Sequence, residues 1–299
     1  RRAALKAEVR AAHRPDGVLL IPSFAVERTQ ELLADLVLLM EEGAIQTAPI
    51  FIDSPLATRA SRVFATHARD LENGELLARA MRAKNVHFTE SVEQSKALDH
   101  QHGFHIVVAA SGMCEAGRIR HRLKNWLWRE EATVLLVGYQ AAGTLGRILE
   151  EGVATVRIQG DEIKVRARIR SLDLYSGHAD GPELAAWLEK CLPIAGEVFL
   201  VHGEEAALAG LAARIAGFVE PRKIVVPSLD SAFELTPEGA RPIGERRVHP
   251  RIDPERAGRR DWHNDYQSLL LDLQDALAGA ADDRARAVVL RKIRRALAD

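Results

Sequence analysis

The stretch Gly17-Val18-Leu19-Leu20-Ile21-Pro22 decides the fold class of this sequence. Its short apolar run is typical of a strand that is buried on both faces of a sheet. A helix is expected over residues 27–42, because apolar side chains recur there on one stripe and Gly43 follows. The next strand is predicted at Pro49-Ile50-Phe51-Ile52, with Ser54 as the cap of a second helix.

The strand-then-helix scheme recurs twice more, at residues 105–110 and 133–138, and each strand is followed by a glycine-bearing turn. Short apolar strands that alternate with helices favour a parallel sheet covered on both faces. The sequence therefore predicts an α/β fold. From about Gly152 the pattern changes to period two, and residues 153–158 and 163–169 predict a hairpin.

Two later strings each place a histidine in a turn between a strand and a helix. They are Ser176-Gly177-His178-Ala179-Asp180 and Val201-His202-Gly203-Glu204. Such turns are where α/β proteins present catalytic groups. An imidazole exchanges protons near neutral pH and is also the commonest metal ligand. Two histidines at neighbouring strand ends therefore predict a hydrolytic site.

Two glycine-bearing strings precede the histidines, at residues 110–118 and 137–147. In this order and at this spacing, the four strings resemble the β-CASP branch of the metallo-β-lactamase superfamily. These are RNA-processing nucleases that include the cleavage-and-polyadenylation endonuclease subunit. The resemblance covers roughly residues 14–227. It implies a parallel-sheet β-CASP domain, the C-terminal part of a metallo-β-lactamase (αβ/βα) domain and an extension, at residues 1–150, 151–227 and 228–299.

The resemblance implies a zinc-dependent ribonuclease that hydrolyses RNA phosphodiester bonds with two zinc ions. His202 matches a metal-ligand histidine of the family. His178 matches a histidine that contacts the scissile phosphate and assists the leaving group. Asp180 or Glu204 is expected to orient an imidazole through its other ring nitrogen, and a helix cap is an alternative of at least equal weight for Asp180.

Residues where strand tips meet helix starts are expected to bind the RNA substrate, because backbone amides and hydroxyls can hold phosphates there. The string of residues 23–29 carries Glu27 where the family usually has a glycine before the arginine. Aromatic residues make up only 5% of the chain, so recognition is expected to rest on backbone and shape. The expected substrate-binding residues are Ser111, Gly112, Arg118, Gly143 and Thr144.

The HxHxDH string of the family is not found in this sequence. The chain is therefore expected to be the C-terminal portion of a longer enzyme and to be inactive alone. The nearest look-alike, His100-Gln101-His102-Gly103-Phe104-His105, is interpreted as a polar loop that enters a strand. Two alternatives stay open: a DNA-directed nuclease of the same superfamily, and a non-catalytic RNA-binding or scaffold subunit.

Composition is that of an ordinary globular protein, with 47% hydrophobic and 28% charged residues and a net charge of −1. Nothing in the sequence resembles a membrane span, and Cys114 and Cys191 give no disulfide framework. A cytoplasmic protein with RNA, and no membrane, as its partner is therefore expected.

The extension beyond residue 228 is strongly basic in one part. Residues 241–260 hold seven arginines against three acids, and helices are expected at 268–278 and 283–298. A solvated arm with a helical cap is the preferred interpretation. An RNA-gripping or dimerising tail is the alternative, so a homodimer remains open.

Overall fold

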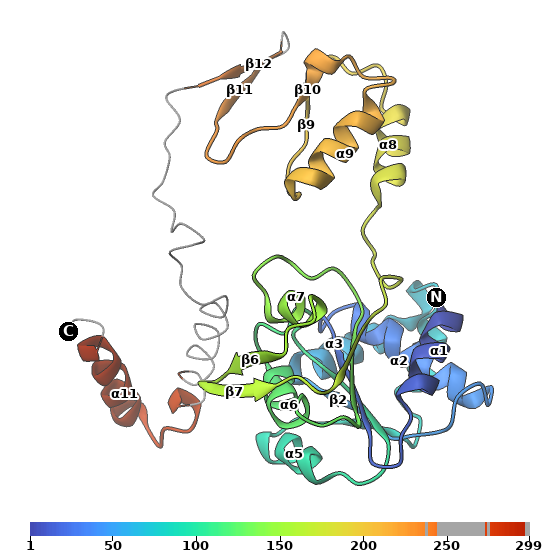
Figure 1. Ribbon diagram of the computed structural model, residues 1–299, viewed down its shortest axis with the longest axis vertical. Helices are drawn as coiled ribbons and strands as arrows, with labels where there is room; N and C mark the ends of the chain where they lie inside the picture. Colours follow the sequence, from blue (N-terminus) through green and yellow to red (C-terminus); the bar gives the residue numbers. More distant parts are fainter. Residues whose placement is uncertain (237–238, 244–272, 274–275, 297–299) are drawn as a thin grey trace. The chain divides into compact units, whose positions relative to one another are not determined.

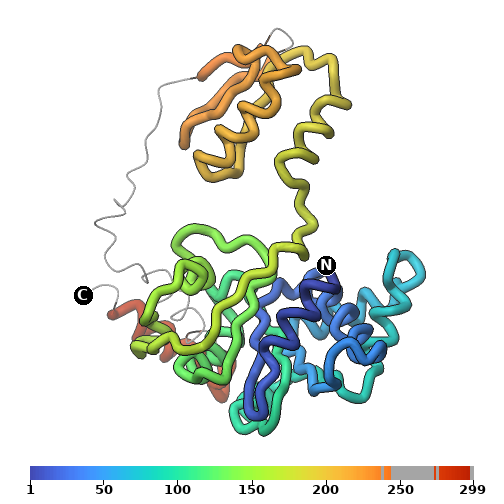
Figure 2. Tube along the Cα trace, turned by 45° about the vertical axis from the view of Figure 1, so that its right-hand side comes forward, coloured from blue at the N-terminus to red at the C-terminus, as the bar shows by residue number. Residues whose placement is uncertain are grey.

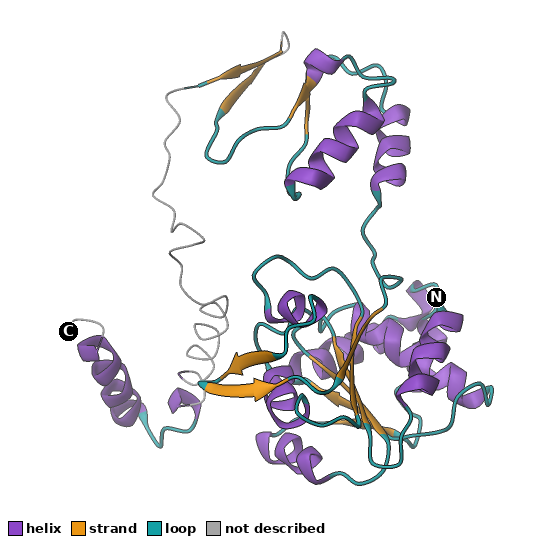
Figure 3. Cartoon of the chain, viewed as in Figure 1, coloured by secondary structure: helices purple, strands orange, loops and turns teal. Residues whose placement is uncertain are grey.

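The computed structural model describes residues 1–236, 239–243, 273 and 276–296. These residues form two units, one of residues 1–176 with 258–299 and one of residues 177–257. The first unit is a layered α/β structure in which helices cover a central sheet (Figures 1 and 3). The second unit contains two helices, a short parallel strand pair and a hairpin.

The central sheet of the first unit has six strands in the order β3-β2-β4-β1-β5-β8. Every neighbouring pair in this sheet is parallel, so the predicted α/β class is confirmed. The strand predicted first, β1, lies between β4 and β5, where Val18 pairs with both His105 and Ala132. The strands are β1 (Val18–Pro22), β2 (Ile50–Asp53), β3 (Val86–Phe88), β4 (His105–Ala109), β5 (Ala132–Leu136) and β8 (Arg168–Ser171).

Both faces of the sheet are covered, because two separate apolar clusters lie against it. Leu19 and Ile21 of β1 belong to one cluster, and Val18 and Leu20 belong to the other. The helices of the first cluster are α1 (Arg2–Ala12), α2 (Arg28–Glu41), α3 (Pro55–Thr66) and α4 (Gly74–Ala80). The second cluster includes residues of α6 (Arg118–Trp126), α7 (Leu145–Glu150) and the hairpin strand β6 (Thr155–Ile158), and a short helix, α5 (Val92–Ala97), precedes its member Leu98.

Local signals set the helix boundaries as expected. The helix predicted at 27–42 is α2, Arg28–Glu41. The Ala57 amide donates to the Ser54 hydroxyl at 3.2 Å, and Pro55 occupies the first helical position of α3. The Ser54 cap is therefore confirmed.

The strand expected over residues 163–169 is wrong as a single strand. The hairpin strand β7 (Asp161–Lys164) pairs with β6 and ends at Lys164. The amides of Arg166 and Ala167 then both donate to the Leu127 carbonyl, at 2.8 and 2.9 Å. This contact takes the chain away from the hairpin and into the central sheet, where it continues as β8 beside β5.

The N-terminal helix α1 is tied to the edge strand β8, although the two are far apart in sequence (Figure 2). Arg170 makes a two-fold contact with Glu8, with nitrogen–oxygen distances of 2.7 and 2.9 Å. The hydrogen bond from Arg170 lowers the pKa of the Glu8 carboxyl. The guanidinium of Arg168 also donates to the Ala11 carbonyl.

The second unit has shorter strands than the sequence predicts. Its elements are α8 (Gly181–Lys190), β9 (Val198–Phe199), α9 (Glu205–Ile215), β10 (Ile224–Val225), β11 (Phe233–Thr236) and β12 (Gly239–Pro242). The strands expected at 197–201 and 223–227 each shrink to two paired residues, in a parallel pair. The hairpin of β11 and β12 was not expected, and it packs through Phe233 on Phe199, with ring centroids 5.0 Å apart.

Half of the extension lies outside the described residues. This applies to 244–260 of the basic stretch and to most of the helix expected at 268–278. The last expected helix is present as α11, Asp283–Ala296. In the described part of the chain, no helix is both long enough and apolar enough to cross a membrane.

His105 of β4 should make the stability of the first unit depend on pH. Its side chain is buried between Phe51 and Trp126, and burial lowers its pKa below the ordinary value of 6.5. As the pH falls through that value, the unfolded chain takes up a proton before the folded one does, so the stability falls. We expect urea unfolding to show that the free energy of unfolding falls less between neutral and mildly acidic pH for His105→Phe than for wild type. Equal losses would contradict the assignment.

Candidate functional site

Three loops meet at one edge of the central sheet. Parallel neighbours β4, β1 and β5 end at the same edge, and they are followed by residues 110–117, 23–27 and 137–144. These three loops are called the sheet-end loops below. This edge is where open α/β sheets bind their ligands.

The loops after β4 and β5 are locked together by hydrogen bonds. The Gln140 side-chain amide donates to the carbonyls of Gly112, at 3.1 Å, and Gly138, at 2.9 Å. The Leu145 amide donates to the Glu115 carboxylate at 2.8 Å. These bonds give the two loops one shared, fixed surface.

Ser111 and Gly112 both have structural tasks in this surface. The Ser111 hydroxyl accepts from the amides of Glu115 and Ala116, at 3.1 and 3.3 Å. Gly112 lies against the ring of Phe24, where a β-carbon would come within 2.9 Å of two ring atoms. A side chain at residue 112 would have to push the Phe24 ring aside, so glycine lets the ring pack closely on this loop.

Gly143 and Thr144 begin the turn into α7. The Thr144 hydroxyl donates to the Ala141 carbonyl at 2.7 Å and accepts from the Arg147 amide at 3.2 Å. The first helical amide, that of Leu145, is already bound to Glu115. Gly143 is exposed with φ +85°, and its amide donates to no acceptor within the described residues. Among the described residues, the turn therefore leaves the Gly143 amide without an acceptor, whereas the Leu145 amide and the Thr144 hydroxyl are engaged.

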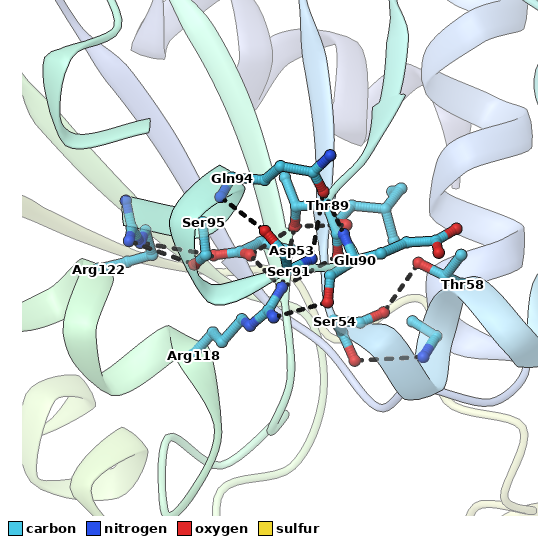
Figure 4. Close-up of polar contacts among 12 residues, drawn as sticks. Asp53, Ser54, Thr58, Thr89, Glu90, Ser91, Gln94, Ser95, Arg118 and Arg122 are labelled. Carbon is cyan, nitrogen blue, oxygen red and sulfur yellow. Dashed lines mark hydrogen bonds and ion pairs between the residues drawn. The ribbon is translucent and has the colours of Figure 1, made fainter. Parts of the chain in front are cut away.

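Arg118 is turned into the protein (Figure 4). Its guanidinium donates to the Asp53 carboxylate at 3.1 Å and to the Thr89 carbonyl at 3.0 Å. Asp53 is fully buried, accepts from the hydroxyls of Thr89 and Ser95 at 2.6 and 2.9 Å, and lies 3.5 Å from Arg122. The sequence interpretation missed Asp53. The sequence feature that could have identified it is an acidic residue at the end of an apolar strand.

His178 lies in the exposed loop that leads into α8. Asp180 caps that helix: its carboxylate accepts from the Glu183 amide at 2.9 Å, and the Glu183 side chain accepts from the Asp180 amide at 3.0 Å. This reciprocal pair is a capping box. Asp180 therefore fixes the chain two residues beyond His178.

His202 lies in the exposed turn between β9 and α9, with φ +60°. Glu204 is the N-cap residue of α9, and no side-chain cap bond forms there. The two histidines follow strands of different sheets. His202 follows β9, whereas the strand before His178 is β8 of the six-stranded sheet.

The described residues do not make a metal site by themselves. No three histidine, cysteine, aspartate or glutamate side chains gather in the described part of the chain to hold an ion. The string of residues 100–105 enters β4, and the His105 ring bonds the Gly103 carbonyl at 2.9 Å. A catalytic zinc needs three protein ligands, so His202 can be at most one of them here.

Glu27 occupies a strained turn in the loop after β1. Its φ and ψ are +66° and −63°, and the Arg28 amide donates to the Val26 carbonyl at 2.9 Å. This is a γ-turn with positive φ, which favours glycine. A glycine would adopt this turn without strain.

Glu27→Gly should therefore stabilise the first unit by about 1 kcal/mol, because glycine adopts positive φ without strain. Val26→Gly is the matched control. Val26 is not among the residues with positive φ, so its replacement should destabilise by about 0.5–1 kcal/mol. Urea unfolding measures both, and a destabilised Glu27→Gly variant would refute the strain argument.

Comparison with known proteins adds two domain matches. A model of the Beta-Casp domain matches residues 29–149. A model of the Zn-dependent metallo-hydrolase RNA specificity domain matches residues 162–227. The first match contains the loops after β4 and β5, and the second contains His178 and His202.

Several curated proteins are similar to this chain. Ribonuclease TTHA0252 of Thermus thermophilus is 39% identical over 208 residues, which are 67% of this chain and 46% of that protein. Transcription termination factor FttA of Pyrococcus abyssi is 31% identical over 217 residues, 67% of this chain and 32% of its own length. FttA of Methanosarcina mazei is 28% identical over 210 residues, 67% of this chain and 33% of its own length. Each alignment spans less than half of the relative.

Proposed function

We propose that this chain, which belongs to the β-CASP branch of the metallo-β-lactamase superfamily, is part of a zinc-dependent ribonuclease that hydrolyses RNA phosphodiester bonds. One observation carries the proposal. The chain joins the interlocked sheet-end loops of a β-CASP domain to a segment matched by an RNA specificity domain, and that segment holds His178 and His202. The proposed domains are residues 1–150 and 151–227, with 228–299 as an extension.

The two histidines have different proposed tasks. His178 contacts the scissile phosphate and protonates the leaving oxygen, a task suited to an imidazole near neutral pH. The residue is exposed in the loop that leads into a capped helix. His202 is proposed as one metal ligand, with the remaining ligands outside the described residues. Glu204 is proposed to orient an imidazole. Zinc, when bound, activates water and balances charge on the phosphate.

The sheet-end loops are proposed to hold the RNA backbone. The exposed Gly143 amide supplies a phosphate donor, and Ser111, Gly112 and Thr144 fix the loops around it. Arg118 is proposed to support the same edge from the protein interior, since its guanidinium donates to the buried Asp53. Phosphate contacts of this kind position a substrate without reading its sequence.

RNA is favoured over DNA because the matched segment is an RNA specificity domain and the first relative is named a ribonuclease. We also propose that the protein is cytoplasmic and that it acts in RNA processing or decay. We also propose that the protein forms a homodimer, which the same preparations can test.

The test uses the enzyme that contains this chain, with RNA and DNA of one sequence supplied in parallel. We expect zinc-dependent cleavage of the RNA and much slower cleavage of the DNA. Equal rates would favour the DNA-directed alternative. RNA binding without cleavage at saturating zinc would favour the scaffold alternative. Size measurement of the same sample reports the oligomeric state.

A further inference from the structure

Two aromatic side chains are exposed at the sheet-end loops. Phe24, two residues beyond β1, is 48% exposed, and Tyr139, beyond β5, is 54% exposed. In the described part of the chain, the other aromatic residues that are exposed to a similar degree are Trp128 and Trp187. Single exposed apolar residues are ordinary, but an aromatic pair at a candidate ligand edge calls for an explanation.

The backbone of Phe24 is held by hydrogen bonds, although its side chain is 48% exposed. Its carbonyl accepts from the Thr29 hydroxyl at 2.7 Å and from the Thr29 amide at 3.3 Å. The preceding amide, that of Ser23, donates to the Ala109 carbonyl at 2.9 Å. The strained turn at Glu27 closes the same loop. These bonds fix the backbone position from which the Phe24 ring projects.

The ring also has a fixed support. It lies against Gly112, where any β-carbon would collide with it. The Gly112 carbonyl shares the Gln140 side-chain donor with the Gly138 carbonyl, so the loop on which the Phe24 ring packs is tied to the residue that precedes Tyr139. Gly143, the exposed residue proposed above as a phosphate donor, lies in the loop that carries Tyr139.

We propose that Phe24 is a stacking platform for one base of single-stranded RNA at the sheet-end loops, which also carry the exposed Tyr139. Proteins that track a single strand combine backbone contacts with aromatic rings on which bases stack, and each stacked base contributes about 5- to 150-fold in affinity. A ring that is already held in place loses little conformational entropy when a base stacks on it. The inference rests on the proposed RNA substrate and adds an unpaired base to it, because a base within a duplex cannot reach the ring.

The test measures binding of the full 299-residue chain to a set of RNA oligonucleotides, each lacking the base at one position. For wild type we expect one position at which removal of the base weakens binding by about 5- to 150-fold. For Phe24→Ala that penalty should vanish, and binding of the intact RNA should fall to the level of the abasic one. Phe24→Tyr should restore the penalty, because its ring stacks equally well.

Two further variants separate stacking from folding. Gly112→Ala displaces the Phe24 ring without changing it and should reduce the same penalty. Trp128→Ala removes an aromatic side chain that is 50% exposed on another loop, and it should leave the penalty intact. Circular dichroism checks that each variant is folded.

The outcomes distinguish this inference from the proposed function. RNA binding with no base-dependent position, or a penalty that survives Phe24→Ala, would overturn the stacking platform alone. Failure of wild type to bind any RNA would overturn the proposed RNA substrate and the platform together.

Discussion

Replacing His178 with alanine is expected to leave the zinc content of the enzyme unchanged and to slow RNA cleavage by ~100-fold to ~10,000-fold. The side chain is exposed in the loop before α8, and the capping box of Asp180 and Glu183 holds the helix start in place. Metal analysis and single-turnover cleavage on one preparation measure both quantities.

Two comparison variants make the result specific. His202→Ala should lose zinc together with activity, because His202 is assigned to the metal. Asp180→Asn should keep nearly full activity if Asp180 serves as a helix cap, since asparagine caps as well as aspartate does. Zinc loss in His178→Ala equal to that in His202→Ala would show that the two roles are wrongly assigned.

Replacing Asp53 with alanine should destabilise the first unit by about 3–5 kcal/mol, because it leaves a buried ionic network without its central carboxylate. Arg122 has a side chain only 2% exposed and Arg118 only 15%, so neither charge can turn to water without cost. The Thr89 and Ser95 hydroxyls lose their acceptor as well. Urea unfolding of the first unit measures the effect.

An exposed ion pair supplies the matched control. Glu90 pairs with Arg62 at the surface through side chains that are 56% and 62% exposed. Glu90→Ala should cost less than about 1 kcal/mol, as exposed pairs do. A cost for Asp53→Ala as small as that for Glu90→Ala would contradict the description of a buried network.

Local sequence signals were sufficient to predict the helix and strand layers of the first unit. The apolar run of β1, the stripe of α2 and the cap at Ser54 depend on neighbours within a few residues, and all three are found as predicted. The cap alternative for Asp180 is equally local, and the capping box confirms it.

Features that depend on distant partners could not be predicted. The break between β7 and β8 is set by one carbonyl, that of Leu127, which no periodicity in residues 163–169 reveals. Arg118 seemed available for RNA because its partner Asp53 lies 65 residues away in the sequence. The inward contacts of the Ser111 and Thr144 hydroxyls likewise depend on how their turns close.

The central claim is that RNA lies along the sheet-end loops, and crosslinking tests it most directly. RNA that carries 4-thiouridine should be bound to the enzyme that contains this chain, irradiated, and the crosslinked peptides identified by mass spectrometry. We expect crosslinks in residues 23–27, 110–117 and 137–144, with Phe24 and Tyr139 prominent among them. Crosslinks that avoid these loops and collect instead at residues 100–104 and 127–131, which precede β4 and β5, would contradict the account.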